Sequence, residues 1–194
     1  MKVQLKGLNF RTVLPRMGEM YRHLEVNRER LSPWFWWAAN SVTPNRARFS
    51  LFVIAYILSS DAKKVAHKFN PKKLYDEQFV IFVDDKVAGM CGLDNIDIKN
   101  NKNAELWFLT FKNNPFEIAD TAIKQVEDYS INIDLNSLYA HVQLDNDKSK
   151  KCLSRNNYTA QPETKNALVA KMPDKFAPVY VFNKVLTKGG SNGR

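Results

Sequence analysis

The stretch from Asn103 to Gln125, NAELWFLTFKNNPFEIADTAIKQ, constrains the fold of this chain more than any other. A mostly apolar segment, typical of a strand, passes through a turn broken by Pro115 into a helical pattern in which Ala119, Ala122 and Ile123 share one face. The first turn of a helix carries unpaired backbone N–H groups and partial positive charge, which together attract anions. The sequence therefore predicts a strand-to-helix junction that can cradle an anion.

The segments around this junction predict a mixed sheet. Residues 78–83 and 87–96 indicate a β-hairpin, with Gly89 and Gly92 favouring a bulge or bend, and residues 104–111 add a third antiparallel strand. Residues 138–144 form a strand after the crossover helix, so this strand should pair parallel to its predecessor. Further strands are expected at 3–14, 167–172 and 179–186, and helices from Pro15 to Leu31 and from Asp145 or Asn146 to Arg155.

One more helix is expected between Ser50 and Lys68. The apolar residues there recur at helical spacing, and we expect the face that they form to pack on the sheet; they are Leu51, Ile54, Ala55, Leu58, Ala62 and Val65. The predicted fold is α/β (α+β), with a mixed, mostly antiparallel sheet of about six to seven strands and helices on both faces. We expect a single domain over residues 1–187 and a disordered tail at 188–194.

The net charge of the chain limits the classes of partner that it could bind but does not identify one. Lys and Arg number 29 against 20 Asp and Glu, for a net charge of +9. Such a balance suits nucleic acid, an anionic membrane, a phosphate-rich ligand or simply a solvated basic face. Since no nucleic-acid motif organises the basic residues, we do not expect nucleic acid as a partner.

Cysteine use and hydropathy indicate a cytoplasmic protein. Cys91 and Cys152 lie far apart and neither forms a C-x-x-C pair, so neither a disulfide framework nor a metal site is expected. The longest apolar run, residues 51–58, is far shorter than the roughly 20 residues that span a bilayer. We therefore expect no membrane association, and the oligomeric state stays open.

An aromatic cluster, Trp34-Phe35-Trp36-Trp37, follows the first helix. Four large rings in a row either close one end of the core or form an aromatic wall beside a ligand cleft, and both roles are compatible. If they line a cleft, Trp34 and Trp37, with Tyr139 from the later strand, are the candidates for contact with a substrate.

The order of elements, with particular residues at their joints, resembles the GNAT acetyltransferase superfamily, in particular its ribosomal-protein N-terminal acetyltransferases. The segment from Asn27 to Trp34 is similar to that branch's N-R-E-x-L-x-x-W motif, and residues 87–93 resemble its V-x-G-x-x-x-L strand. Residues 104–108 resemble the A-E-[IL]-G-[YF] strand, residues 118–123 the helix that follows, and Asn146-x-x-Ser149 the N-x-x-S motif. These matches are spread over most of residues 3–186.

The resemblance implies an acetyl-CoA-dependent N-acetyltransferase, in which a primary amine attacks the thioester directly; a protein N-terminus is one candidate acceptor. Glu105 is then the candidate base, and Ser149 the donor to the departing thiolate. Acetyl-CoA would lie along the strand edge, the following loop with the helix start, and the N-x-x-S segment; the residues are Leu109, Thr110, Phe111, Lys112, Asn113, Asn114, Phe116, Glu117, Ile118, Asn146 and Ser149. His141 could also be a base, or a plain sheet-face residue, and Asn146 and Ser149 could simply begin a helix.

The chain departs from the family in its phosphate loop. The family pattern [QR]-x-x-G-x-[GA] uses glycines so that backbone N–H groups approach the diphosphate closely. Residues 112–117 of this chain, KNNPFE, contain no glycine, and Glu117 places negative charge there. Two hypotheses follow: an enzyme with an altered phosphate cradle, or a catalytically inactive GNAT-like binding or assembly module with weak or no acetyl-CoA binding.

Overall fold

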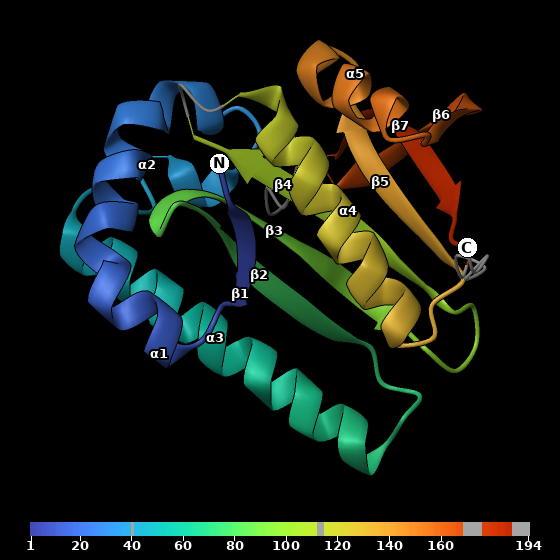
Figure 1. Cartoon of the computed structure of the whole chain (residues 1–194), viewed down its shortest axis with the longest axis horizontal. Helices are drawn as coiled ribbons and strands as arrows, with labels where there is room; N and C mark the ends of the chain where they lie inside the picture. Colours follow the sequence, from blue (N-terminus) through green and yellow to red (C-terminus); the bar gives the residue numbers. More distant parts are fainter. Residues whose placement is uncertain (40, 112–114, 169–175, 188–194) are drawn as a thin grey trace.

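A computed structural model describes residues 1–39, 41–111, 115–168 and 176–187 of the chain. Seven strands form one sheet in the order β1-β2-β3-β4-β5-β7-β6 (Figure 1). The strands are β1 (Val3–Gly7), β2 (Tyr75–Val83), β3 (Lys86–Asp97), β4 (Asn103–Thr110), β5 (Ser137–Gln143), β6 (Thr159–Leu168) and β7 (Phe176–Val185). The α-helices are α1 (Phe10–Val13), α2 (Met17–Leu31), α3 (Arg46–Phe69), α4 (Phe116–Asn132) and α5 (Asp147–Arg155).

Helices cover both faces of the sheet, as predicted, because strand residues alternate between two cores. On one face Ile81 and Leu106 pack with Ile123 of α4, and on the other Val80 and Met90 pack with the residues of α2 and α3. Two 3-10 helices, Leu14–Arg16 and Trp36–Ala38, flank α2. Among the described residues, no helix is long and apolar enough to cross a membrane.

The central strands of the sheet diverge. β4 and β5 pair in parallel, as the crossover helix predicts, but only where Asn103–Glu105 meets Ser137–Tyr139. Beyond this short contact β5 pairs with β7, while β4 stays paired with β3. The strands therefore open like a V toward the N-terminus of α4 and the start of α5.

The hairpin holds the bulge that its glycines predict. The pairing of β2 with β3 shifts between Ile81 and Phe82, opposite Gly89 and Val87. A Cβ on Gly89 would lie 2.3 Å from the carbonyl oxygen of Leu109, so only glycine lets β4 approach β3 this closely. Asp84 and Asp85 turn the hairpin with φ of 47° and 63°, values typical of a type I′ turn.

Some boundaries differ from the predictions. The first strand ends at Gly7 instead of Leu14, because Asn9 accepts a hydrogen bond from the Thr12 N–H and begins α1. The strand expected at 167–172 instead begins at Thr159, since it follows directly on α5 and needs the length of β7 to pair. Residues 169–172 and the predicted tail at 188–194 lie outside the described residues.

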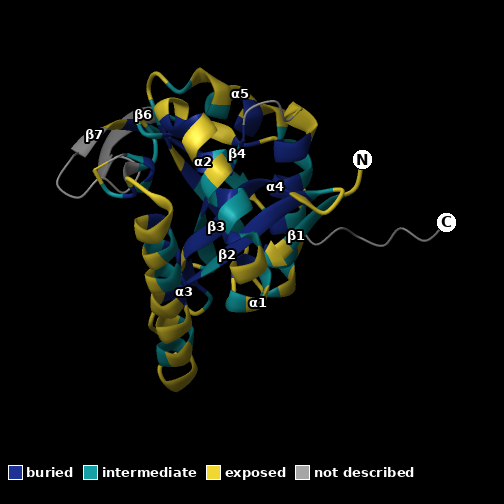
Figure 2. Cartoon of the chain, turned by 90° about the vertical axis from the view of Figure 1, so that its left-hand side faces the viewer, coloured by how far each residue is buried: buried dark blue, intermediate teal, exposed yellow. Residues whose placement is uncertain are grey.

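The prediction for the apolar face of α3 is wrong. Helix α3 packs on the sheet through a different set of residues, Phe49, Val53, Ile57 and Ser60. Ile54 of the predicted set is half-buried, and the rest of the set is exposed to solvent: Leu51, Ala55, Leu58, Ala62 and Val65. Figure 2 shows the C-terminal part of α3 extending beyond the rest of the molecule, with exposed residues along it.

Candidate active site

A cavity of about 1080 Å³ lies where β4 and β5 diverge. Its walls come from the segments that the sequence analysis singled out: the aromatic cluster, both central strands, the first turn of α4 and the start of α5. Such a volume is at the upper end of the roughly 300–1,000 Å³ range of ligand pockets. It can hold two reactants side by side.

Glu105 and His141 meet in this cavity. Glu105 lies on β4 and His141 on β5, and the His141 Nδ1 atom is 2.9 Å from the Glu105 Oε1 atom. Both side chains are about a quarter exposed, at 26% and 28%. If Nδ1 carries the proton that it donates to the carboxylate, Nε2 of the neutral ring is left as a proton acceptor. The predicted base is therefore joined to a second group that can move a proton.

Other polar groups surround this pair. Asp94 of β3 lies opposite Glu105 in the sheet register, and the Gln78 side chain donates to its Oδ1 at 2.8 Å. The ring of Tyr139 packs edge-on against that of His141, with centroids 5.5 Å apart. Burial, reinforced by the carboxylates of Glu105 and Asp94, raises the pKa of Tyr139 to about 12. Tyr139 thus keeps its proton at neutral pH and can donate a hydrogen bond.

The α2–α3 side of the cavity is aromatic. Trp34 and Trp37 line it, as the cleft hypothesis expects. The Trp37 ring stacks on Phe52 of α3 at 5.9 Å, and Phe35 packs against both Trp37 and Trp107 of β4. Phe35 and Trp37 therefore belong both to the core and to the wall of the cavity, and Trp34 belongs to the wall.

Arg28, from the motif at the end of α2, holds this aromatic segment in place. Its buried guanidinium donates to the carbonyl oxygens of Ala38 at 2.7 Å and Thr43 at 2.9 Å. The same group pairs with Glu25. Two backbone carbonyls at the far end of the aromatic segment are thus tied to α2.

The open edge of β4 is covered at one point by Arg30. The Phe111 N–H donates to the carbonyl oxygen of Ala88 in β3. The carbonyl of the preceding Thr110 therefore points to the opposite edge of β4, because successive strand residues alternate. Arg30 Nη2 donates to that carbonyl at 2.6 Å, and burial lowers the pKa of Arg30. Of the predicted edge residues, the side chains of Leu109 and Phe111 are buried in the core with α2 and α3.

The N-terminus of α4 opens onto the cavity at Phe116. Pro115 precedes the helix without a side-chain cap, and Phe116 and Glu117 are exposed while Ile118 is buried. The guanidinium of Arg155 lies 5.2 Å from the centre of the Phe116 ring. Lys112, Asn113 and Asn114, the predicted loop contacts, lie outside the described residues.

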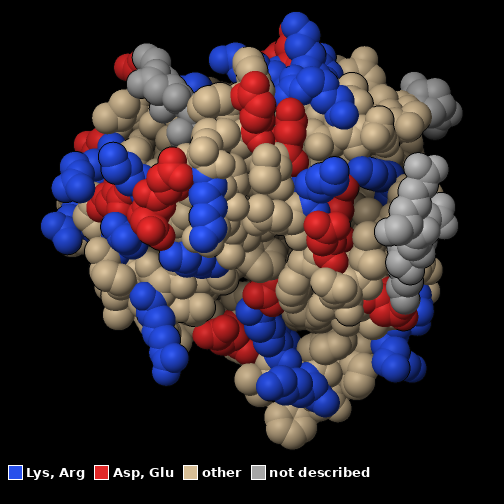
Figure 3. Space-filling view, in the orientation of Figure 1, with Lys and Arg blue, Asp and Glu red and all other residues tan. Residues whose placement is uncertain are grey.

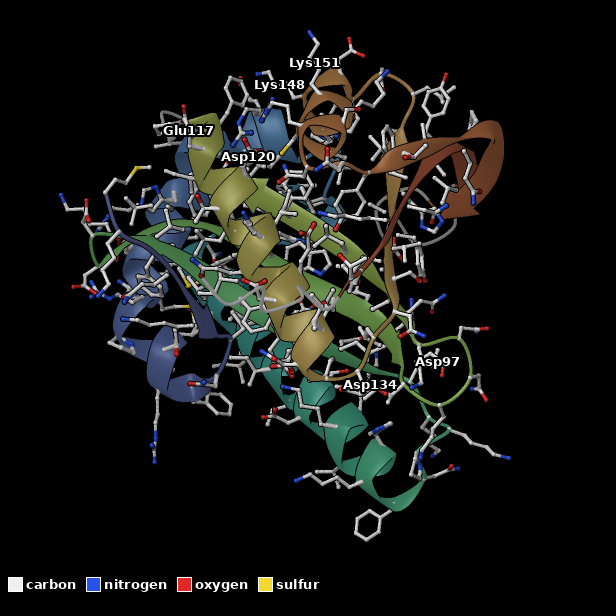
Figure 4. All side chains as sticks on the ribbon, turned by 45° about the vertical axis from the view of Figure 1, so that its right-hand side comes forward. Asp97, Glu117, Asp120, Asp134, Lys148 and Lys151 are labelled. Carbon is white, nitrogen blue, oxygen red and sulfur yellow. The ribbon has the colours of Figure 1, made fainter. Side chains whose placement is uncertain are left out.

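Basic residues of α5 stand over this end of α4. Figure 3 shows Lys and Arg side chains gathered at the top of the view, beside a few acidic ones. Figure 4 shows Lys148 and Lys151 on α5, at the same end of the molecule as Glu117 and Asp120 of α4. Lys148 also lines the cavity. This end of the cavity thus combines a helix N-terminus with positively charged side chains, which suits an anionic ligand.

Asn146 and Ser149 begin α5. The Asn146 Oδ1 atom accepts from the Ser149 N–H at 3.2 Å and caps the helix. Both residues also line the cavity. The helix-start role is therefore confirmed, and it does not exclude a ligand-binding role, because the Asn146 amide and the Ser149 hydroxyl remain chemically able to donate.

A polar network joins α4 to α5. Asp120 accepts from Cys152 Sγ at 3.3 Å, from Arg155 at 3.1 Å and from Asn156 at 2.8 Å. Burial raises the pKa of Asp120, but the hydrogen bonds from Arg155, Asn156 and Cys152 outweigh it, and the net pKa is lowered. Burial and the Asp120 contact raise the pKa of Cys152 to about 12. Cys152 is a packed thiol and not an activated nucleophile.

Sequence reasoning missed several residues of the site. Arg30, Trp107 and Phe52 were not singled out, although the alternation along β4 places Trp107 on the same face as Glu105. That signal was available in the sequence. The described residues hold no group of three or more His, Cys, Asp and Glu able to bind a metal ion.

The architecture of the sheet, splayed at its centre with a helix N-terminus at the opening, is that of the GNAT acetyltransferase fold. No protein-family model and no curated protein matches the sequence. Solved structures do match: the microcin C7 self-immunity acetyltransferase MccE, solved with acetyl-CoA and AMP, has a TM-score of 0.73 at 18% identity, covering 95% of this chain and 92% of that one.

Two further structures are similar at the same level of identity. RimL, a ribosomal L7/L12 alpha-N-protein acetyltransferase solved with coenzyme A, has a TM-score of 0.68 at 14% identity, covering 96% of this chain and 95% of that one. The spermidine N-acetyltransferase from Vibrio cholerae, solved with CoA and spermine, has a TM-score of 0.61 at 16% identity, covering 95% of each chain. At such identities the matches establish the fold, and the predicted fold class is confirmed.

Proposed function

We propose that this protein transfers an acetyl group from acetyl-CoA to a primary amine. The observation that carries the proposal is the Glu105–His141 pair, which lies in the cavity at the divergence of β4 and β5. Similar structures were solved with CoA or acetyl-CoA, which supports the choice of co-substrate. Acetyl-CoA would supply an acetyl group activated as a thioester.

The chain's own residues fit that co-substrate in part. The phosphates would lie at the start of α4, within reach of Lys148 and other basic residues of α5, and Asn146 would orient the adjoining amide-rich arm. Glu117 in the first turn opposes this arrangement by its charge. We expect the positive charge of the α5 side chains to outweigh the negative charge of Glu117. An anion could then bind although the loop lacks the glycines of the family pattern.

The residues at the divergence manage protons. The amine must lose a proton as its nitrogen forms the bond to the acetyl carbon, while the carbon–sulfur bond breaks. His141 accepts that proton at Nε2, and Glu105, bonded to Nδ1, fixes the ring tautomer and stabilises the charged ring. Ser149, at the start of α5, donates a hydrogen bond to the departing sulfur.

The acceptor would enter from the aromatic side. Trp34, Trp37 and Tyr139 face the cavity or lie beside the pair, so they would contact the body of the amine. A protein N-terminus is one candidate, supported by the structural similarity to RimL, the ribosomal L7/L12 alpha-N-protein acetyltransferase. We retain a cytoplasmic location as a proposal, on the ground that Cys91 and Cys152 are free and buried.

The second candidate is a GNAT-like module that binds without catalysis. The absence of glycine from residues 112–117 favours it, since it weakens the usual phosphate cradle. Isothermal titration calorimetry with acetyl-CoA distinguishes a protein that binds the co-substrate from one that no longer binds it. The absence of binding heat at millimolar acetyl-CoA would reject the hypothesis that the protein is an acetyltransferase.

Single substitutions then test the proton-transfer roles. With an amine panel of peptides and polyamines, Glu105→Gln and His141→Gln should each lower kcat by about 100-fold or more, with a changed pH–rate profile and an acetyl-CoA Kd within about twofold of wild type. Ser149→Ala should lower kcat by about tenfold. His67→Gln, an exchange of a histidine on α3 that does not line the cavity, is the matched control. Binding with no turnover on any amine would favour the second candidate.

A further inference from the structure

Helix α3 carries an exposed apolar stripe directly opposite its core-facing side. The stripe comprises Leu51, Ala55, Leu58, Ala62, Val65 and Phe69, which follow one another in alternating steps of four and three residues. All six are exposed, with Leu51 at 62%, Leu58 at 55%, Val65 at 51% and Phe69 at 87%. At about 100° per residue, they lie across the helix from Phe49, Val53 and Ile57, which pack on the sheet.

This spacing is that of a coiled-coil seam. A helix that covers a globular core or lies on a membrane needs a broad apolar face, whereas a narrow seam in steps of three and four suits one partner helix. A helix that lies on a membrane carries charged residues on the side opposite its apolar face. In α3 that opposite side is packed on the sheet. Its residues Lys63 and Lys64 are also paired with Asp76 and Glu77 of β2. The seam therefore favours a helix over a lipid surface.

We propose that α3 pairs antiparallel with α3 of a second copy of this chain. The sizes of the seam residues select this partner. In a parallel pair, each residue would face its own equivalent, so layers of two alanines would alternate with layers of two leucines or two valines. In an antiparallel pair centred at the level of Ser60, Leu58 faces the partner's Ala62 and Ala55 faces the partner's Val65, so in the four central layers each larger side chain meets an alanine.

The same register uses the whole stripe. Leu51 then faces the partner's Phe69, and all six positions of each chain are covered at once. The stripe spans about 27 Å at about 1.5 Å per residue, on a helix about 10 Å wide. It offers a few hundred Å² per chain, below the roughly 800 Å² of a standard interface. The dimer should therefore be reversible, with a Kd of about micromolar order.

The charge of the chain adds a salt dependence. Two copies at +9 repel each other, and salt screens this repulsion over about 8 Å at physiological ionic strength. Dimerisation through an apolar seam should thus become tighter as salt is raised. An association through ion pairs would become weaker.

Sedimentation equilibrium from about 1 to 100 µM, at low and high salt, tests the proposal. The wild type should be a concentration-dependent dimer, and Leu58→Glu should raise the dimer Kd by at least about 100-fold, because it places a charge in the seam of both chains. Val26→Glu is the matched control, since Val26 is a 74% exposed apolar residue on another helix. It should leave the Kd unchanged, and both variants should keep the wild-type circular dichroism and melting temperature.

Cysteine cross-linking tests the orientation. Cys91 and Cys152 are buried, so a new surface thiol dominates mild oxidation. A mixture of Leu58→Cys and Ala62→Cys proteins should form a mixed disulfide-linked dimer, and each variant alone should form much less. Efficient linkage of Ala62→Cys to itself would indicate a parallel pair and would overturn the antiparallel arrangement.

Two other outcomes would overturn the proposal altogether. One is a wild type that stays monomeric over the whole concentration and salt range. The other is a dimer that Leu58→Glu leaves intact, which would place the interface elsewhere. If the monomer instead sediments with vesicles containing phosphatidylserine, and Leu58→Glu abolishes this, the stripe is a membrane-binding surface.

Discussion

The two walls of the cavity are built from different chemistry. The wall from α2 and α3 is a cluster of aromatic rings, fixed from behind by Arg28. The wall from α4 and α5 consists of two helix N-termini joined by the hydrogen bonds of Asp120. Rings recognise a substrate by shape, whereas helix termini and basic side chains recognise phosphates and amides. Under the proposed function, this difference would place the acceptor at the first wall and the co-substrate at the second.

The largest expected effect comes from removing the contacts that hold the aromatic wall in place. Arg28→Met removes the donors to the carbonyls of Ala38 and Thr43 and leaves buried polar atoms unpaired. We expect a loss of about 3 kcal/mol in the free energy of unfolding, measured by urea denaturation. Under the proposed function, the KM of the folded variant for the amine should rise by about tenfold or more, while its acetyl-CoA Kd changes little.

Arg30→Met is the matched control for this prediction. Arg30 lies two residues further along α2 but donates to Thr110 on the strand edge, not to the aromatic segment. Its loss should change acetyl-CoA binding more than the amine KM, because Thr110 faces the open edge of β4. An equal effect of both variants on both substrates would show that the two walls are not separate sites.

The sequence predicted the strand-to-helix junction, the parallel pairing of β5 and most helix bounds, because these depend on local pattern and on chain connectivity. It misplaced the core face of α3, because that helix has two apolar faces of nearly the same period. Val53 and Ile57 are as apolar as Leu51 and Leu58, and periodicity alone does not say which set meets the sheet.

The site shows the same limit. Glu105 could be named from its motif, but its pairing with His141 depends on the register in which Glu105 lies beside Tyr139 and on the divergence beyond it. Both are properties of the assembled sheet. Residues that act through contacts between distant segments, such as Arg30 with Thr110, leave no local pattern in the sequence.

A smaller effect should come from the polar wall. Asp120→Asn keeps the shape of the side chain but removes the charge that accepts from Arg155, Asn156 and Cys152. We expect a loss of about 1–2 kcal/mol in unfolding free energy at pH 7. Because the pKa of Asp120 is lowered in the folded protein, its contribution is present above the unfolded pKa and is lost as the pH falls through the folded pKa.

The measurement is therefore the difference in unfolding free energy between wild type and Asp120→Asn as a function of pH. This difference should shrink as the pH falls from about 5 toward 2, where the wild-type carboxylate takes up its proton. Asp128→Asn, at an exposed position on the same helix, is the control and should show no comparable loss at pH 7. A difference in unfolding free energy that stays constant with pH would mean that the charge of Asp120 does not stabilise the wall from α4 and α5.

The smallest expected effect distinguishes the two roles of Asn146. Asn146→Ser keeps an oxygen that caps α5, whereas Asn146→Ala removes the cap at a cost of about 1 kcal/mol. If the Asn146 amide also binds acetyl-CoA, the serine variant should keep the wild-type melting temperature and raise the acetyl-CoA Kd by about fivefold, which corresponds to one lost hydrogen bond. Calorimetry and thermal unfolding on both variants separate these effects. An unchanged Kd in the serine variant would leave Asn146 as a cap alone, and the second wall would then bind its ligand through α4 and the basic residues of α5.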